Sequence, residues 1–270
     1  MELVDTHCHI QSAGATTGEA NTRELWAKAP DKTGDEMIAA AAEQGVTRLL
    51  CVGCDLADSQ QAVDFVQSRE NCWATIGIHP HEAQQYVADD EKLVEFAALA
   101  TQSKVVAVGE CGLDYYYNHS PKEAQLTLLK FQIELALKHD LPLIFHVREA
   151  FDDFWPIFEQ YQGIRGVLHS FTDNQANLDK ALAHGLSIGV NGIATFAKNP
   201  DQLAIYKAIP LQNLLLETDA PFLTPAPYRG SINEPKYVAV VAQFLADVRG
   251  ENLENLTAQT TTNAHTLFGI

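Results

Sequence analysis

The chain has 270 residues, of which 46% are hydrophobic, and its formal net charge at pH 7 is −17. A chain of this length can bury one large core, and α/β barrels commonly reach about 250 residues as a single domain. The acidic balance argues against a broad basic surface for nucleic acid, because phosphate contacts normally come from clustered Lys and Arg. Bound divalent cations would offset that charge locally.

The five cysteines are scattered along the chain, which is more typical of reduced thiols than of a disulfide framework. Cys51 and Cys54 form a CxxC pair, but no second pair completes a zinc site, so we expect buried thiols. No apolar run approaches the ~20 residues that span a bilayer, and the N-terminus carries no leader-like segment. These features predict a cytoplasmic protein without a membrane partner, and none indicates an obligate protein partner.

In chain order, eight short apolar runs are typical of buried parallel strands. They are Leu3 to Thr6, Arg48 to Val52, Trp73 to Ile78, Val105 to Val108, Leu143 to Phe145, Gly166 to Leu168, Leu186 to Val190 and Leu214 to Leu216. The segments between them have helical periodicity, and the clearest helix follows Ser120, a candidate N-cap, with Glu123 completing a capping box. A strand followed by a helix, repeated eight times, predicts a (β/α)8 TIM barrel that forms a single domain over residues 1–270. A doubly wound open sheet is the alternative.

A long polar segment, from Gln11 to Gly34, follows the first strand and carries Trp26. It is long for a connection between a strand and a helix. On a barrel this 11–34 loop would lie over the active-site face. There it would act as a lid or specificity element, or it would be a mobile insertion without function.

His7 and His9 are two residues apart at the end of the first strand. Residues i and i+2 of an extended segment face the same side, so both imidazoles can reach one metal ion. An HxH pair alone is weak support for a metal site. Four further candidate ligands follow other strands: Glu110, His146, His169 and Asp219. The carboxyl ends of the strands converge at one face of a parallel barrel, so the six residues predict a metal centre.

Imidazole and carboxylate ligands without thiolate suit Zn²⁺, Mn²⁺, Co²⁺ or Fe²⁺, while an all-oxygen shell would favour Mg²⁺ or Ca²⁺. Two divalent ions would polarise a substrate oxygen and lower the pKa of a shared water. The pattern therefore predicts metal-assisted hydrolysis, with the identity of the ions left open among Zn, Mn, Mg, Co and Fe.

Several stretches together resemble the TatD family of metal-dependent deoxyribonucleases, within the amidohydrolase superfamily of TIM barrels. They are Asp5-Thr6-His7-Cys8-His9, Gly77-Ile78-His79-Pro80-His81, Gly109-Glu110-Cys111-Gly112-Leu113-Asp114-Tyr115, His146-Val147-Arg148-Glu149-Ala150, His169-Ser170-Phe171-Thr172 and Glu217-Thr218-Asp219-Ala220-Pro221. The resemblance implies that His7, His9 and Asp219 bind one metal, that His146 and His169 bind the other, and that Glu110 bridges both. It also implies hydrolysis of DNA phosphodiesters, with Asp219 as the general base.

The chain departs from the usual family pattern in two places. Val147-Arg148-Glu149 stands where Ser-Arg-Asp is usual, which keeps the arginine and loses a hydroxyl. Ser231-Ile232 replaces a basic pair after Arg229-Gly230. Two potential phosphate contacts are therefore absent.

Further residues are candidates for contacts with the substrate or with a ligand. His79 and His81 follow the third strand and are candidates for contacting a phosphate or protonating a leaving group. Arg148 and Arg229 would hold a phosphate, or would pair with nearby carboxylates. Glu217 would orient a metal ligand from behind.

Other residues near the predicted site carry weaker functional signals. The tyrosines at 115–117 are candidates for base stacking but more commonly pack. Cys8 and Cys111 alternate with ligands and are expected to be core thiols. His119 is expected to be an ordinary surface residue.

The sequence thus predicts a metal-dependent hydrolase of DNA, acting on single strands or ends. One alternative is a metal-dependent hydrolase of a small phosphoester, ester or amide. Another is a barrel that holds metal for stability or binding without turnover. A mixed set of ligands is more typical of an open catalytic site than of a closed structural one.

Overall fold

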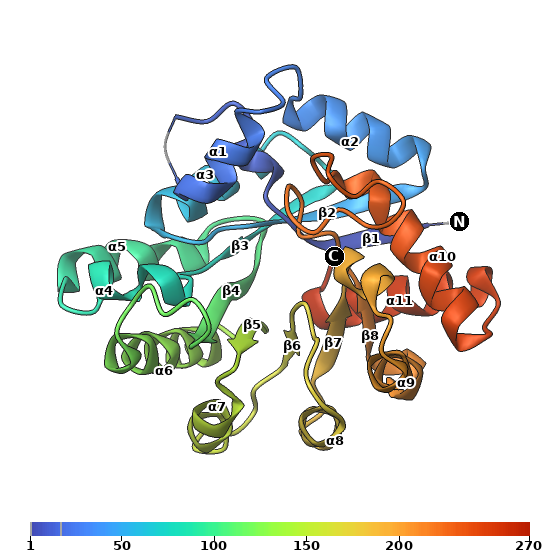
Figure 1. Ribbon diagram of the computed structural model, residues 1–270. Helices are drawn as coiled ribbons and strands as arrows, with labels where there is room; N and C mark the ends of the chain where they lie inside the picture. The colour runs from blue at the N-terminus through green and yellow to red at the C-terminus, as the bar shows by residue number, and fades with distance from the viewer. Residues whose placement is uncertain (1, 17) are drawn as a thin grey trace.

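The computed structural model describes residues 2–16 and 18–270, and its eight parallel strands form one sheet that curls into a barrel (Figure 1). The strands are β1 (Leu3–Cys8), β2 (Val46–Val52), β3 (Cys72–Ile76), β4 (Val105–Asp114), β5 (Leu143–Arg148), β6 (Gly166–Leu168), β7 (Ser187–Val190) and β8 (Leu214–Leu216). Their spatial order follows the chain order from β1 to β8. This order confirms the TIM barrel, because a doubly wound sheet would reverse its strand order part-way.

The barrel closes between β1 and the segment that follows β8. Cys8 and Ala220 form an isolated parallel bridge. The amide of Asp219 donates to the carbonyl of His7 over 2.8 Å, and the amide of His9 donates to the carbonyl of Ala220 over 2.8 Å. The closure therefore brings the residues of the HxH pair directly against Asp219.

Helices surround the strands on the outside. The α-helices are α1 (Ala20–Trp26), α2 (Gly34–Glu43), α3 (Leu56–Val66), α4 (Ala83–Tyr86), α5 (Asp90–Ala98), α6 (Lys122–Lys138), α7 (Phe151–Phe158), α8 (Gln175–Ala183), α9 (Pro200–Ala208), α10 (Val238–Arg249) and α11 (Leu253–Phe268). Short 3-10 helices are η1 (Ile10–Ser12), η2 (Pro80–Glu82), η3 (Leu99–Thr101), η4 (Gly192–Phe196), η5 (Leu211–Asn213) and η6 (Pro235–Tyr237). Among the described residues, no helix combines the length and apolar character needed to cross a membrane.

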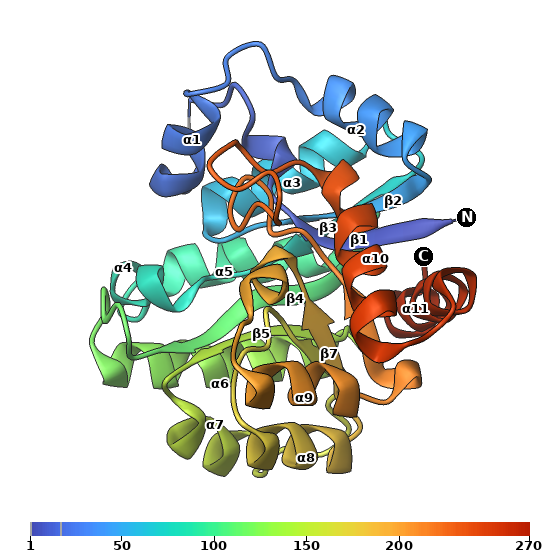
Figure 2. The ribbon, with the colours of Figure 1, turned by 45° about the vertical axis from the view of Figure 1, so that its right-hand side comes forward.

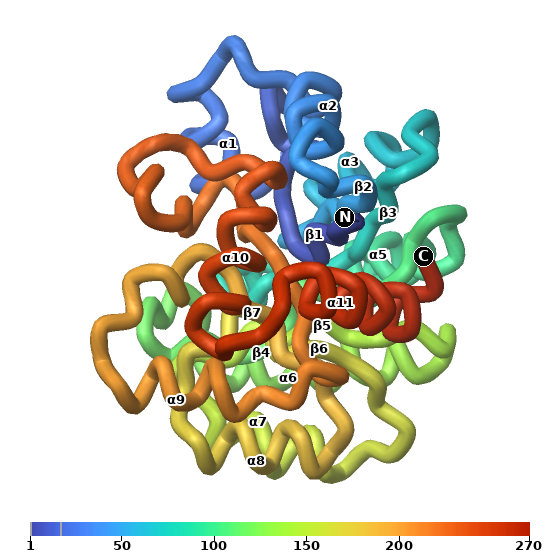
Figure 3. Tube along the Cα trace, turned by 90° about the vertical axis from the view of Figure 1, so that its right-hand side faces the viewer, coloured from blue at the N-terminus to red at the C-terminus, as the bar shows by residue number. Residues whose placement is uncertain are grey.

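The apolar strand residues divide into two clusters. The larger one packs the strands against the surrounding helices. The smaller one joins side chains from six strands, such as Val4, Leu50 and Ile144, to Phe268 of α11. Side chains of six strands can meet only inside the barrel, so this cluster fills its interior. Helix α11 lies beside β1 (Figure 3), and it covers this interior cluster at the end remote from the HxH pair.

The predicted 11–34 loop is partly helical. Thr17 lies outside the described residues, and the rest contains η1 and α1 before α2 begins at Gly34. Figure 2 shows α1 above the strands, close to the loop that follows β8. Trp26 is buried at 2% exposure, and its Nε1 donates to the carbonyl of His9 over 3.0 Å. The segment is thus tied to the first strand through a buried indole.

The expected capping box at α6 does not form. The helix begins at Lys122, its N-cap is Pro121, and no side chain caps it. The Ser120 hydroxyl donates instead to the carbonyl of His81 over 2.6 Å and accepts from the amide of Gln84 over 3.0 Å. Ser120 therefore connects the loop after β4 to the loop after β3.

All five cysteines are free and buried, as expected from the sequence. Cys8 and Cys111 belong to the larger apolar cluster.

Candidate metal centre and active site

All six predicted ligands come from strands or from the residues directly after them. His7 is the second-last residue of β1, and His9 directly follows that strand. Glu110 lies in β4, and His146 lies in β5. His169 follows β6, and Asp219 follows β8 by three residues. The close approach of β4 to β5 depends on Gly112, whose φ is +153°, because a Cβ there would lie 1.8 Å from the carbonyl oxygen of His146.

Glu110 lies at the centre of this group. Its Oε2 is 3.3 Å from Nε2 of His7. Its Oε1 is 2.7 Å from Nδ1 of His146 and 3.8 Å from Nε2 of His169. One carboxylate therefore contacts histidines from three different strands.

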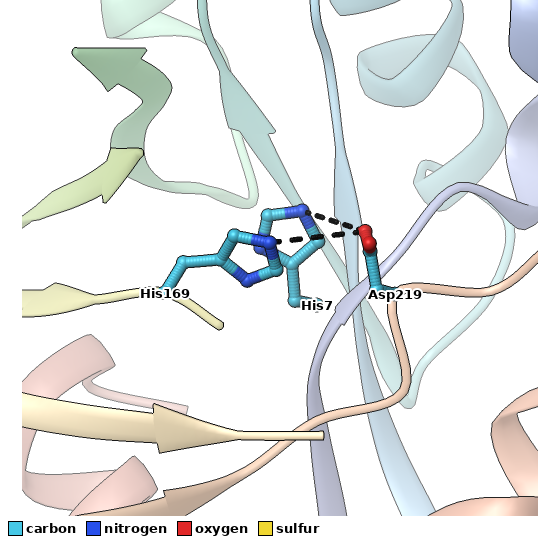
Figure 4. Close-up of side chains that lie close together, drawn as sticks. All are labelled: His7, His169 and Asp219. Carbon is cyan, nitrogen blue, oxygen red and sulfur yellow. Dashed lines mark ion pairs between the residues drawn. The ribbon is translucent and has the colours of Figure 1, made fainter. Parts of the chain in front are cut away.

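Asp219 faces the same point from the other side. Its Oδ1 lies 3.4 Å from Nε2 of His9, 3.7 Å from Nε2 of His7 and 3.8 Å from Nε2 of His169. Figure 4 shows His7, His169 and Asp219 pointing toward one another, and the two imidazole rings are stacked with centroids 3.6 Å apart. The structure thus gathers all six predicted residues.

Contacts behind the rings set which nitrogen faces the centre. Nδ1 of His9 lies 2.8 Å from the carbonyl oxygen of Val52. Nδ1 of His169 lies 2.9 Å from Oε1 of Glu217, which also accepts from the amide of Ser170 over 2.7 Å. In both residues Nε2 is therefore left to face the carboxylates, and Glu217 lies where an orienting role would place it.

Two buried carboxylates, Asp114 and Asp5, support the centre without having been predicted as site residues. Oδ2 of Asp114 lies 2.9 Å from Nε2 of His146 and 3.1 Å from Nε2 of His81. Asp5 accepts from both the amide and the hydroxyl of Thr218, over 2.9 and 2.6 Å, and so holds the residue before Asp219. Both acids lie in the sequence motifs that carry the family resemblance, and that position is the feature from which their importance could have been predicted.

The donor set fits a divalent metal ion. His7 is fully buried, and neither of its ring nitrogens has a hydrogen-bond partner among the described residues. Leaving a buried imidazole nitrogen without a partner costs folding free energy. Nε2 of His7 lies near the carboxylates of Glu110 and Asp219, where a bound cation would satisfy it. Imidazole and carboxylate atoms gathered in this way are ligands for Zn²⁺-like and Mn²⁺-like ions.

Burial and charge interactions shift the pKa values of these groups. Burial, with the nearby His169, lowers the pKa of His7. Burial also disfavours the charged forms of His9 and His169, but carboxylate neighbours outweigh it and raise the pKa of His9 to about 9 and that of His169 to about 10. Burial opposes ionisation of Glu110, but the surrounding histidines hold its pKa well below the usual range. The carboxylate is therefore ionised and suited to bind cations.

A cavity of about 560 Å³ opens over the centre and is lined by five of the six residues, whereas His7 is fully buried. His79, His81 and Arg148, which the sequence suggested as substrate contacts, line this cavity, and His79 Nε2 lies 3.6 Å from Oε1 of Glu110. Arg229 is placed elsewhere: it is exposed and its guanidinium lies 4.6 Å from the centroid of the Phe196 ring. Its role in substrate binding stays a prediction without a contact to the cavity.

Helix α1 forms one wall of the cavity through residues that include Asn21, Thr22 and Leu25, and Lys28 follows it. His119, which was expected to be an ordinary surface histidine, lines the cavity near His81. His119 is exposed, as expected, but its place at the cavity was not predicted, because a local pattern does not reveal the path of the loop after β4.

Residues 4–269 match the sequence profile of the family described as TatD related DNase. A 3'-5' ssDNA/RNA exonuclease TatD from Erwinia amylovora is 38% identical over 247 residues, which cover 88% of this chain and 95% of that protein. The protein of the same description from Escherichia coli K12 is 37% identical over 248 residues, covering 88% of this chain and 94% of that protein. YabD of Bacillus subtilis, described as an uncharacterized metal-dependent hydrolase, is 34% identical over 272 residues and 99% of each chain.

Among solved structures, the TatD homolog YJJV from Escherichia coli K12 has a TM-score of 0.86 at 26% identity, covering 99% of this chain and 98% of that chain. A TatD-family hydrolase from Entamoeba histolytica has a TM-score of 0.85 at 22% identity, covering 99% and 98% of the two chains, and supports the fold alone. The range matched by the family profile contains all six converging residues.

Proposed function

Since this chain belongs to the TatD-related DNase family and is a metal-dependent hydrolase of ester bonds, we propose that it removes nucleotides from the 3′ ends of single-stranded DNA. The observation that carries the proposal is the convergence of six ligand-type residues, five of which line one cavity together with an arginine, Arg148. Apart from this arginine, Lys28 and the histidines, the charged residues that line the cavity are acidic, so bound cations would supply charge that attracts a phosphodiester.

We propose that the centre holds two divalent ions. His7, His9 and Asp219 would hold one, His146 and His169 the other, and Glu110 would contact both. Glu110 belongs to two separate groups of potential ligands, one with His7 and His9 and one with His79 and His146, which supports a shared role. When bound, such ions polarise a phosphoryl oxygen and make water a stronger nucleophile near neutral pH.

Asp219 is the proposed general base. Burial opposes its ionisation, but His9 and its neighbours lower its pKa, so the carboxylate is available to accept a proton. Its side chain is 14% exposed and lines the cavity, where it can meet the attacking water.

The remaining cavity residues would orient the phosphodiester. The guanidinium of Arg148 can donate two parallel hydrogen bonds to phosphate oxygens. Burial lowers the pKa of His79 to about 4, so this imidazole is neutral at pH 7. Its Nδ1 accepts from the amide of His81, which leaves an Nε2–H to donate to a phosphate oxygen.

The test uses protein freed of metal and a single-stranded DNA oligonucleotide labelled at its 5′ end. Adding Mg²⁺, Mn²⁺, Zn²⁺ or Co²⁺ back should produce a ladder that shortens from the 3′ end. Asp219→Asn should lose at least 100-fold in rate, because removing an essential proton acceptor typically costs about 10²–10⁴-fold. The proposal fails if no added metal restores cleavage, or if Asp219→Asn cleaves like the wild type.

A small phosphodiester is the second candidate substrate. The wall formed by α1 favours it, because a cavity of about 560 Å³ is the size of a small-ligand site. Competition separates the two: an oligonucleotide should inhibit hydrolysis of bis(p-nitrophenyl) phosphate at micromolar concentration if DNA is the substrate, and should have no effect if the small ester is.

A further inference from the structure

The turn after β4 presents two parallel aromatic rings to the active-site cavity. The rings of Tyr117 and His119 have centroids 5.9 Å apart and planes 9° apart, and both residues line the cavity. The amide of Tyr117 donates to Oδ1 of Asp114 over 2.9 Å, which fixes the turn to the end of the strand. The rings of His119 and His81 form a T-shaped pair with centroids 4.6 Å apart. These aromatic rings are therefore continuous with the catalytic face.

Packing of the core does not account for this arrangement. Tyr117 is 51% exposed and the adjacent Tyr116 is 53% exposed. Tyr115 packs against the core, whereas the other two tyrosines do not belong to any apolar cluster of the described residues. A tyrosine that serves packing normally buries its ring, because burial of the aromatic surface is its main contribution to stability.

Arg148 completes the group with a positive charge. Its guanidinium carbon lies 4.2 Å from the centroid of the Tyr116 ring and 4.9 Å from that of Tyr117. Four other arginines pair with carboxylates, whereas Arg148 forms no ion pair within residues 2–16 and 18–270. In a chain of net charge −17, a cation that has no carboxylate partner and lines the active-site cavity is suited to an anionic ligand.

We propose that Tyr117 and His119 form a stacking platform for one nucleobase of the substrate strand, and that Arg148 binds the phosphate beside that base. Every nucleobase has a flat face that can stack on an aromatic ring, so such a platform holds a strand without reading its sequence. Tyr117 and His119 follow β4, and Arg148 is the last residue of the neighbouring β5, so base and phosphate would be held side by side. The inference rests on the proposed function, and it specifies how that site would hold a nucleic acid rather than a small ester.

Binding is tested with a short DNA strand that carries 2-aminopurine near its 3′ end, because stacking quenches the fluorescence of this base. All proteins carry Asp219→Asn, so that the strand stays intact, and are loaded with Mn²⁺. We expect quenching with the parent protein, and about a tenfold weaker Kd with loss of quenching after Tyr117→Ala. Tyr117→Trp should retain both. Tyr228→Ala is the matched control, because Tyr228 is 46% exposed and does not line the cavity.

Turnover is tested with otherwise wild-type proteins and a pair of oligonucleotides that differ by one abasic residue at the quenched position. Tyr117→Ala should lower kcat/KM about tenfold on the intact strand and leave it unchanged on the abasic strand. The platform is refuted if the variant quenches and cleaves like the wild type, or if it loses the same factor on both strands. If the wild-type protein neither binds nor cleaves any strand, the proposed function itself fails. The wild-type measurement alone shows that outcome, so it is distinguished from a failure of the platform.

Discussion

Oδ2 of Asp114 lies 2.9 Å from Nε2 of His146, on the side of the imidazole opposite to Nδ1, which faces Glu110 at 2.7 Å. The carboxylate is fully buried, and His146 and His81 hold its pKa well below the usual range against the opposing effect of burial. A carboxylate on the remote nitrogen of a ligand histidine fixes the ring and increases its basicity. Asp114 thus determines which nitrogen of His146 faces the proposed metal centre.

Replacing this carboxylate should weaken metal binding. Asp114→Asn should lower the affinity for Mn²⁺ or Zn²⁺ by about 10–100-fold, because the amide no longer supplies the negative charge. The asparagine keeps an oxygen that can accept from the amide of Tyr117, so the turn after β4 is preserved. Affinity is measured by competition with a chelating dye, and activity should recover as metal is raised.

Asp35→Asn is the control, since Asp35 is an exposed carboxylate paired with Arg69 away from the cavity. The orienting role of Asp114 is wrong if Asp114→Asn binds metal as tightly as this control does. It is also wrong if excess metal leaves the activity of Asp114→Asn at the reduced level.

Substitution of Glu110 distinguishes a centre in which this carboxylate contacts both ions from one in which it contacts a single ion. If it contacts both ions, Glu110→Gln should reduce the metal content from about two ions per chain to less than one. His9→Asn should remove about one ion, because it touches only one side of the centre. Metal content is measured by elemental analysis after dialysis.

Glu82→Gln serves as the control for Glu110→Gln, because Glu82 lines the same cavity without contacting the six residues. This variant should keep the full metal content. A single ion in the wild-type protein, or equal losses in Glu110→Gln and His9→Asn, would rule out the bridging arrangement.

The barrel and the six converging residues were predictable from the sequence, because each ligand follows within a few residues of an apolar run that forms a strand. A parallel barrel collects the carboxyl ends of its strands at one face, so the position in the sequence is enough to place them. The role of Asp114 was not predictable in this way. The apolar run of the fourth strand stops at Val108, while the strand itself continues to Asp114 after an irregular register between Val108 and Cys111.

Contacts between loops were the other features that local patterns missed. Helix α1 is capped by Glu19, which accepts from the amides of Asn21 and Thr22, although glutamate is not among the favoured N-cap residues. Ser120 has a side chain that is favoured at N-caps, but its hydroxyl donates to the carbonyl of His81 in the loop after β3. At Glu19 an unusual capping residue decides the local structure, and at Ser120 a partner that is 39 residues away in the sequence does so.

Metal removal should lower the thermal stability of the chain. An ion that binds only the folded state at 100 times its Kd adds about 2.7 kcal/mol, which is about 5–10 °C in Tm for a domain of this size. We expect this rise when Mn²⁺ or Zn²⁺ is added to metal-free protein in differential scanning calorimetry. Asp219→Asn should show a smaller rise, and the proposed centre is contradicted if the metal leaves the Tm of the wild type unchanged.

Trp26 should link the 11–34 segment to the stability of the catalytic face. Its ring is 2% exposed, and its Nε1 holds the carbonyl of His9, a residue of the metal centre. Trp26→Ala should lower the free energy of unfolding by about 3–5 kcal/mol through the cavity it leaves. Trp26→Phe keeps most of the apolar volume and leaves one carbonyl without its partner, which should cost about 1–3 kcal/mol.

Urea denaturation measures these values for Trp26→Ala and Trp26→Phe, with Val94→Ala as the control. Val94 is 71% exposed, so its substitution should stay within about 0.5 kcal/mol of the wild type. Both substitutions of Trp26 should also weaken metal binding, because they loosen the backbone of His9. If Trp26→Ala unfolds within about 1 kcal/mol of the control, the indole does not anchor the segment, and α1 reaches the cavity wall by other contacts.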